Sequence, residues 1–310
     1  MNTQNDTAPR FIGTEIEPRL SWLGLTDALI AGHKMPRAEV ADSFLYRGPD
    51  TLLTRSAWID GFGIAVKPAT IFPHNADRGA PGVNGVVNLL TDRTGELEAL
   101  VDFHLVTKWK TAGDSLLAAR KLVRPDAKEV LIIGAGHVAE NMIAAYRALI
   151  PDARITIWNR TNKTAEDLAQ RVNAEVSDDL PKAVAKAELI ATATMARDPI
   201  LQGDWLSPGT HVDLIGSFRP GLREADDHAL QRASLFVDNR NTTIGHVGEI
   251  QIPMESGAIR EEDIIADFYD LETGRFARRS EDEITICKNG GGAHLDLMTA
   301  RYILEAASAA

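Results

Sequence analysis

The stretch KEVLIIGAGHVAENMIAAYRAL, residues 128–149, constrains the fold more than any other part of the chain. An apolar run of strand length ends at a glycine turn, and apolar residues at helical spacing follow directly. At the junction, Gly134, Gly136 and Ala139 form the pattern G-x-G-x-x-A. These residues permit a tight turn, a close approach of pyrophosphate to the backbone, and close packing of helix on strand. The stretch therefore predicts a site for a nicotinamide or flavin dinucleotide; a glycine turn used only for packing is the alternative.

The same alternation of strand and helix continues along the chain. RITIWN and KTAEDLAQRV are typical of a second strand and helix, and ELIATATM, HVDLIGS and SLFVDNR of further strands with short helices between them. Units of this length predict a Rossmann-type α/β fold, a parallel sheet with helices on both faces. Between about 43 and 107, short apolar runs alternate with turn signals, which predicts a mixed or antiparallel sheet. The final helical stretch, AHLDLMTARYILEAAS, is long enough to pack back onto this first region.

The end of the second strand bears on the type of cofactor. An NAD site usually has Asp or Glu there, which binds the ribose 2′-hydroxyl. Here the strand ends in Asn159, followed by Arg160, Thr161 and Lys163. A carboxylate would repel a 2′-phosphate, whereas the two cations would neutralise it. The segment therefore favours NADPH over NADH, with solvated loop cations as the alternative interpretation.

Composition excludes several classes of protein. The 310-residue chain has 44 acidic and 33 basic residues and a formal net charge of −11, which argues against a nucleic-acid partner. Cys287 is the only cysteine, so no internal disulfide can form and a cysteine-based zinc site is not expected. His74, His104 and His294 do not have the spacing of metal ligands, so we expect no metal site. The chain shows neither a signal peptide nor an apolar run long enough for a membrane span, so we expect a soluble, cytoplasmic protein.

A set of short stretches occurs in order from about residue 50 to residue 300. They are AVKPATIFPHN, TGELEALVDFHLVT, WKTAGDS, VLIIGAG, IWNRT, DPILQGDWLSPGTHVDLIGS, RPGLREADD, GE at 248–249, and KNGGGAHLDL. Together they resemble the ornithine cyclodeaminase/mu-crystallin family. The resemblance implies a Rossmann-type NAD(P)-binding domain at 116–292 and a discontinuous α+β domain, 1–115 with 293–310, for substrate binding and dimerisation. Members use nicotinamide dinucleotides on amino acids, imino acids or their cyclic relatives, and WNRT resembles the NADPH-binding mu-crystallin branch.

The resemblance also implies roles for individual residues. Lys67, in the apolar strand GIAVKPATIF, matches a lysine of the family's substrate site, although a strand lysine can equally face solvent. In a closed pocket it could bind a carboxylate or donate a proton. Lys110 stands where the family has an arginine that clamps the substrate carboxylate, and it keeps the charge without the planar fork. Asn75 is a family-like pocket residue or a turn residue. Asp296 matches a family aspartate near the final helix, with either a catalytic role or a helix-dipole role.

The remaining site predictions concern the cofactor. By resemblance, Thr111 reaches its pyrophosphate. The full set of residues that we expect to bind the cofactor is Thr111, Gly134, Gly136, His137, Val138, Asn159, Arg160, Thr161, Lys163, Thr194, Met195, Ser217 and Gly292.

The segment IGSFRPGLREADD, 215–227, bears on the reaction. Cyclodeaminases of the family have an aspartate two residues after the glycine that ends the preceding strand, and this chain has Phe218 there. Phenylalanine cannot transfer a proton, but it can wall an apolar pocket that excludes water. We expect Ser217 and Phe218 to border the nicotinamide and the substrate. The acidic residues that follow are typical of a helix N-terminus: Glu224, Asp226 and Asp227.

These features predict an NADPH-dependent reductase of small, cyclic or open 2-imino carboxylates, such as pyrroline-2-carboxylate or piperideine-2-carboxylate. Lys67 and Lys110 would hold the carboxylate, and Lys67 or water would manage the proton on nitrogen. One alternative is an amino-acid cyclodeaminase or dehydrogenase of the same family, against which Phe218 counts. The other is a non-catalytic protein that binds NADPH and a small ligand.

Overall fold

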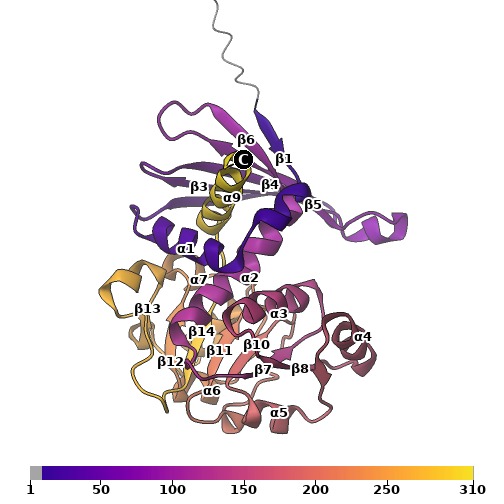
Figure 1. Cartoon of the computed structure of the whole chain (residues 1–310), viewed down its shortest axis with the longest axis vertical. Helices are drawn as coiled ribbons and strands as arrows, with labels where there is room; N and C mark the ends of the chain where they lie inside the picture. Colours follow the sequence, from indigo (N-terminus) through magenta and orange to yellow (C-terminus); the bar gives the residue numbers. More distant parts are fainter. Residues whose placement is uncertain (1–8, 310) are drawn as a thin grey trace, which may run out of the picture. The chain divides into compact units, whose positions relative to one another are not determined.

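The structure is a computed structural model that describes residues 9–309, apart from the side chain of Ala76. These residues form two compact units (Figure 1). The first unit comprises the described residues before Thr111 and after Gly291, and the second comprises Thr111–Gly291.

A six-stranded sheet forms the centre of the first unit. Its order is β1-β6-β5-β4-β3-β2; β1 pairs parallel with β6, and all other neighbours pair antiparallel. The turn signals in the sequence fall between strands, as at Gly61, whose positive φ of 72° suits the β3–β4 turn. The strands are β1 (Arg10–Ile12), β2 (Glu39–Arg47), β3 (Asp50–Ile59), β4 (Gly63–Ile71), β5 (Val83–Leu90) and β6 (Leu97–Asp102).

A long helix covers one face of this sheet. α9 (Ala293–Ser308) packs against β3, β4 and β5 and against α1 (Trp22–His33) (Figure 1). Buried and partly exposed residues alternate along β4, so that Ala65, Lys67 and Ala69 share the buried face. All eight residues of α9 from Ala293 to Ala300 are buried, including the polar ones. Two short 3₁₀ helices, η1 (Thr14–Arg19) and η2 (Pro73–Arg78), complete the unit.

An eight-stranded parallel sheet forms the centre of the second unit (Figure 1). Its order is β13-β12-β14-β11-β10-β7-β8-β9. The strands are β7 (Glu129–Ile133), β8 (Arg154–Trp158), β9 (Glu175–Val176), β10 (Leu189–Thr192), β11 (His211–Leu214), β12 (Ser234–Val237), β13 (Ile264–Ala266) and β14 (Thr285–Lys288). The helices are α3 (His137–Leu149), α4 (Asn162–Val172), α5 (Leu180–Lys186), α6 (Asp227–Arg232), α7 (Arg240–Thr243) and α8 (Gly248–Glu255), with the 3₁₀ helices η3 (Gly203–Trp205), η4 (Glu261–Asp263) and η5 (Phe268–Thr273). α2 (Phe103–Leu122) contributes residues to both units.

The predicted parallel sheet and the second, antiparallel-rich sheet are confirmed. Three strands of the parallel sheet were missed: β9, β13 and β14. β14 has only four residues, TICK, all of them buried, and it pairs with both β11 and β12. A short run that is buried on both faces shows no periodicity by which it can be recognised. β12 follows β11 in the sequence, but the two strands are not neighbours in the sheet, because β14 lies between them.

Candidate active site

Lys67 is the centre of a polar cluster in the first unit. The alternation along β4 turns its side chain to the buried face of the sheet, where it is 6% exposed. Its ammonium group donates hydrogen bonds to Asp296 Oδ1 at 2.7 Å and to Thr107 Oγ1 at 2.9 Å. The ammonium also lies 4.6 Å from the ring centroid of Phe103, within cation–π range. The side chain therefore does not point to solvent.

Asp296 is the negative partner in this cluster and is 1% exposed. Its Oδ2 is buried and has no hydrogen-bond partner in the described part of the chain. Burial alone would raise the pKa of Asp296, but the positive charges of Lys67, Lys110 and Arg55 hold that pKa below its ordinary value. Asp296 therefore stays ionised, with one oxygen left to accept a hydrogen bond.

The pKa of Lys67 changes in the opposite sense to that of a typical surface lysine beside a carboxylate. Burial lowers this pKa, the charge of Asp296 raises it, and the charge of Lys110 lowers it again, so the net change is downward. A lysine in this state can give up a proton more readily than an exposed one. The cluster can thus both bind an anion and transfer a proton.

Arg55 is a cation of this cluster that the sequence analysis missed. It lies on β3 directly opposite Lys67 in the antiparallel register, so both side chains extend from the same face. Its guanidinium binds Asp42 of β2 through Nε, at 3.0 Å, and Nη2, at 2.8 Å. The sequence predicted a mixed or antiparallel sheet between about 43 and 107 but no pairing of its strands, and the register of β3 with β4 is what places Arg55 beside Lys67.

The other two predicted substrate residues of the first unit lie in different surroundings. Lys110 is half-buried on α2, and its charge acts on Lys67 and Asp296. Asn75 belongs to η2, where its side chain donates to Pro81 O at 2.9 Å and its backbone N–H donates to Phe72 O. The amide of Asn75 thus has a turn role in the structure.

The glycine turn of the second unit forms an open helix N-terminus. Gly134 has a φ of +122°, and a Cβ there would lie 2.7 Å from Ala193 O, so only glycine fits. Gly136 is the N-cap of α3, and a Cβ there would meet nothing within 4 Å. His137 and Val138 follow in the first turn and are exposed. The N–H groups of this turn are therefore accessible to a phosphate.

The segment after β8 offers one uncommitted cation. Arg160 is exposed, and the structure gives it no hydrogen bond or ion pair within residues 9–309. Lys163 instead binds Asp167 at 2.6 Å, one helical turn along α4. Asn159 donates to Thr161 O and to Thr164 Oγ1, which shapes the start of that helix. Arg160 is thus better placed than Lys163 to bind a ligand phosphate.

The loops after β10 and β11 carry the remaining predicted residues of the second unit. Met195 is 75% exposed and Phe218 is 49% exposed, with the Arg219 guanidinium 5.0 Å from the Phe218 ring centroid. Thr194 is half-buried and Ser217 is buried, with its hydroxyl donating to Leu222 O. Of the other predicted cofactor residues, Thr111 is half-buried on α2, and Gly292 is the buried N-cap of α9 in the first unit.

The interpretation of Glu224 as part of a helix N-terminus was wrong. Asp226 does cap α6, accepting from Ala229 N, and Asp227 begins that helix. Glu224 lies before the helix and is 0% exposed. Its carboxylate accepts hydrogen bonds from both loops, including those from Thr194 N and Gly216 N. The prediction relied on the charge of Glu224, which is typical of a solvated helix start. The backbone donors that bind its carboxylate belong to other segments and cannot be identified from the sequence.

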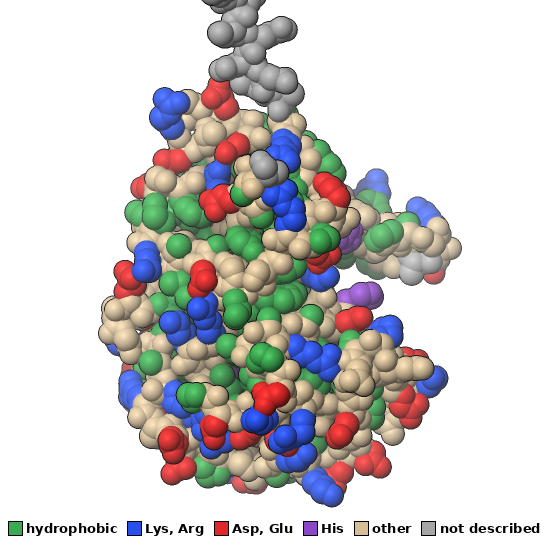
Figure 2. Space-filling model, viewed as in Figure 1, with side chains coloured by type: hydrophobic (Ala, Val, Ile, Leu, Met, Phe, Trp, Pro, Cys, Tyr) green, Lys and Arg blue, Asp and Glu red, His purple; other side chains and the backbone are tan. Residues whose placement is uncertain are grey.

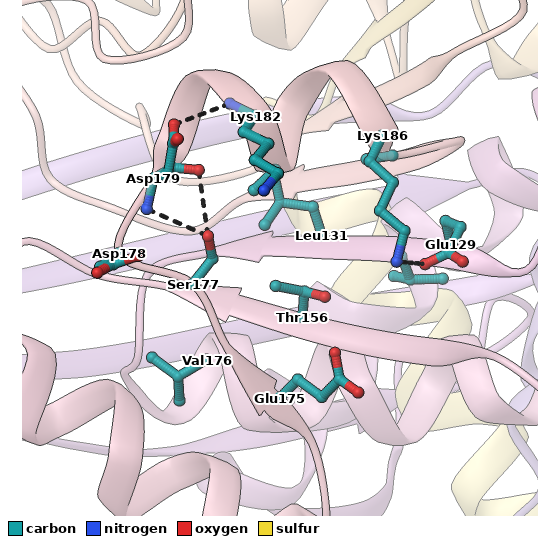
Figure 3. A pocket seen from close by; sticks show the side chains of 13 residues that line it. Glu129, Leu131, Thr156, Glu175, Val176, Ser177, Asp178, Asp179, Lys182 and Lys186 are labelled. Atoms are coloured by element: carbon teal, nitrogen blue, oxygen red, sulfur yellow. Dashed lines mark hydrogen bonds and ion pairs between the residues drawn. The ribbon is translucent and has the colours of Figure 1, made fainter.

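A groove of about 290 Å³ lies elsewhere on the second unit (Figure 3). It is lined by the beginning of β7, by β8, β9 and α5, and Lys186 on its wall pairs with Glu129 at 3.0 Å. None of the predicted site residues lines it. Ligands of open α/β sheets bind beyond the carboxyl ends of the strands, whereas this groove is at the beginning of β7. It is therefore not the dinucleotide site.

The remaining features of the described residues concern groups of metal ligands, membrane-spanning helices and surface charge. No group of three or more His, Cys, Asp or Glu residues within 9–309 could hold a metal ion. No helix in the same range has the length and apolarity needed to cross a membrane. Acidic and basic side chains are interspersed on the face of the molecule shown in Figure 2.

Comparison with known proteins places the chain in a family. The model of the ornithine cyclodeaminase/mu-crystallin family matches residues 56–310. The chain belongs to this family. The family assignment confirms the resemblance drawn from the ordered motifs.

Three of the similar proteins are named as reductases or a dehydrogenase. The chain is 47% identical over 308 residues to a Delta(1)-pyrroline-2-carboxylate reductase of Paracoccus denitrificans, covering 97% of this chain and 98% of that one. It is similar in structure to the Thermococcus litoralis Delta(1)-pyrroline-2-carboxylate reductase in complex with NADH and L-proline, with a TM-score of 0.86 and 25% identity over 97% of this chain and 98% of that one. It is also similar to an archaeal alanine dehydrogenase dimer with bound NAD, with a TM-score of 0.87 and 25% identity over 97% and 96%.

Proposed function

We propose that this chain is an NADPH-dependent reductase of small 2-imino carboxylates, with cyclic ketimines such as pyrroline-2-carboxylate and piperideine-2-carboxylate as the expected substrates. Relatives that are pyrroline-2-carboxylate reductases support this class of reaction. The observation that carries the proposal is the buried Lys67–Asp296 pair with further cations around it.

The charge balance of this cluster suits an anionic substrate. Three cations, Lys67, Lys110 and Arg55, act on Asp296, and Asp42 neutralises Arg55. One positive charge is therefore in excess. An excess charge that is partly buried is costly until an opposite charge arrives, so the cluster favours binding of a carboxylate. Lys67 and Lys110 are the residues that we expect to hold it.

The chemistry needs a hydride at the imine carbon and a proton at the imine nitrogen. When bound, the reduced nicotinamide supplies the hydride. Lys67 Nζ can hold the substrate and release a proton, and its lowered pKa favours that release. Asp296 keeps the positive charge of Lys67, or of a protonated imine, stable in a buried site. Phe218 in place of an acidic residue fits reduction better than cyclodeamination.

Two features of the second unit support NADPH as the cofactor. Gly134, Gly136 and the open N-terminus of α3 form a cradle for the pyrophosphate. Asn159 leaves out the carboxylate that would repel a 2′-phosphate, and Arg160 is exposed and uncommitted within the described residues. The related solved structures hold NADH or NAD, so the 2′-phosphate preference would distinguish this chain from them.

A homodimer is part of the proposal. β2 is an edge strand of the first unit's sheet and carries three consecutive exposed apolar residues, Phe44, Leu45 and Tyr46, at 48%, 69% and 73%. An exposed apolar edge strand invites pairing with a second chain, and a structurally similar alanine dehydrogenase is a dimer. We therefore propose a second copy of this chain as the occupant of this edge.

We also propose that the protein is located in the cytoplasm, where the buried thiol of Cys287 would stay reduced.

The proposed function is tested with a panel of ketimines. Purified protein is mixed with NADPH and each ketimine in turn, and the loss of reduced-nicotinamide absorbance is followed together with the amino acid formed. The proposal expects turnover with at least one cyclic 2-imino carboxylate. Ammonia release from ornithine with NAD, without ketimine reduction, would instead identify a cyclodeaminase. Tight ketimine binding with no absorbance change would identify a binding protein.

A further inference from the structure

Glu224 connects two loops of the second unit through one carboxylate. Oε1 accepts hydrogen bonds from Thr194 N at 2.8 Å and from Thr194 Oγ1 at 2.6 Å, after β10. Oε2 accepts from Gly216 N at 2.9 Å and Ser217 N at 3.2 Å, after β11, and from Thr192 Oγ1 at 2.8 Å. Five donors from two neighbouring strand ends thus converge on a carboxylate that is 0% exposed.

The backbone around Glu224 is itself fixed. Glu224 N and Ala225 N donate to the Glu249 carboxylate at 2.7 and 2.9 Å, from the start of α8. Glu224 O accepts from Ile200 N and Leu201 N, each at 2.9 Å. A Cβ on Gly216 would overlap the backbone of Thr194, so the two loops are in direct contact. Hydrogen bonds therefore hold both the backbone and the carboxylate of Glu224, and the carboxylate binds both loops.

These loops lie where the nicotinamide half of a dinucleotide is expected. The pyrophosphate cradle follows β7, and the adenosine half extends from it toward the end of β8. β10 and β11 lie on the other side of β7, so the second half of the cofactor extends over their carboxyl ends. The two exposed apolar side chains of the loops, Met195 and Phe218, are available there to contact a planar ring.

We propose that Glu224 is a positioning residue that fixes the Met195 and Phe218 loops for the nicotinamide half of the cofactor. Without this carboxylate, the donors of both loops lose their common acceptor, and the loops are free to adopt other arrangements. The inference rests on the proposed use of a nicotinamide dinucleotide and not on the identity of the imine.

Glu224→Gln tests this role with the shape of the side chain retained. The dissociation constants of NADPH and of the same molecule without its nicotinamide, 2′-phospho-ADP-ribose, are measured by calorimetry. We expect NADPH to bind about tenfold more weakly or worse, because the amide nitrogen of glutamine cannot accept the hydrogen bonds that one oxygen of Glu224 accepts, while the fragment binds as in the wild type. Glu175→Gln, an exposed carboxylate on β9 of the same sheet, is the matched control and should change neither constant.

Two outcomes overturn the inference: an equal loss for NADPH and the fragment, or no loss for NADPH. If Glu224→Gln does not fold, as judged by circular dichroism, Thr192→Val decides. It removes one donor to Glu224 from a buried position, and it should weaken NADPH selectively and to a smaller degree. A wild-type protein that binds NADPH but reduces no imine would refute the proposed function and leave the role of Glu224 standing.

Discussion

Lys67 Nζ and Asp296 Oδ1 lie 2.7 Å apart, and both side chains are almost closed to solvent, at 8% and 1% exposure. A buried ion pair of this kind contributes little net stability over apolar residues, but removing one partner leaves an uncompensated charge. The pair joins β4 to α9, residues that are 229 positions apart in the sequence. Its cost and its position support the proposed role of the pair in chemistry.

Lys67→Met is expected to abolish ketimine reduction, by about 100-fold or more, because it removes a carboxylate ligand and a proton donor together. NADPH should bind with an unchanged dissociation constant, since Lys67 is not among the residues that we expect to bind the cofactor. The variant should also lose about 3–5 kcal/mol of unfolding free energy, because Asp296 is left buried without its partner. A double variant that also carries Asp296→Asn should recover part of the lost unfolding free energy, as measured by denaturant unfolding. A fully active Lys67→Met would remove Lys67 from the site.

Asp296→Asn is expected to move the pH profile of turnover. Asp296 raises the pKa of Lys67, so its removal lowers that pKa further. An ammonium group is present only below its pKa, so activity that needs protonated Lys67 should fall away at a lower pH than in the wild type. The profile of kcat/KM against pH measures this shift. If the fall of kcat/KM at high pH stays at the same pH or moves to a higher one, Asp296 does not control the protonation of Lys67.

Arg160→Ala is expected to weaken NADPH by about tenfold or more and to leave NADH nearly unchanged, because only NADPH carries the 2′-phosphate. Lys163→Ala is the matched control and should have a smaller effect, since Lys163 already pairs with Asp167. Dissociation constants of both cofactors for both variants provide the comparison. Equal effects of Arg160→Ala on NADPH and NADH would refute the 2′-phosphate assignment.

Glu249 should make the protein less stable as the pH rises. Burial is the main cause that raises the pKa of Glu249, from 4.5 to about 7. A raised pKa in the folded state means that the stabilising protonated form is present below about 4.5 and is lost as the pH passes through about 7. The corresponding loss is on the order of 3 kcal/mol. Glu249→Gln should remove this component. The unfolding free energy, measured with urea between these pH values, should therefore depend less on pH in the variant than in the wild type. An unchanged slope would contradict it.

Leu45→Glu should separate the proposed dimer. The substitution puts a charge on the apolar edge of β2 without touching the buried face of the sheet. Light scattering after size-exclusion chromatography should give the mass of one chain for the variant and of two for the wild type. Glu39→Gln, a neutralising change on the same strand, should leave the dimer intact. A monomeric wild type would exclude the edge as an interface between copies.

Local patterns predicted the fold well where a pattern existed. The G-x-G-x-x-A turn and the strand–helix repeats identified the parallel sheet, because each depends on residues close together in the chain. β14 was not predicted, because its four buried residues show no periodic pattern. Without β14, the order of the strands beyond β11 could not be predicted either.

Long-range polar contacts were beyond the reach of the sequence. The pairing of Lys67 with Asp296 depends on how α9 packs on β4, which no local pattern encodes. Glu224 was misread for the same reason, since its partners are backbone N–H groups of two loops. Arg55 was also missed, although its position opposite Lys67 depends only on the register of two neighbouring strands, β3 and β4.

The central claim is that the buried cations of the first unit select an imine that bears a carboxylate. The most direct test is the initial rate of NADPH oxidation with pyrroline-2-carboxylate and with the same ring without its carboxylate. We predict that kcat/KM is higher for the carboxylate by about 100-fold or more, as expected when a buried ion pair is lost. Equal values for the two imines, or no oxidation of NADPH by any 2-imino carboxylate, would contradict this account.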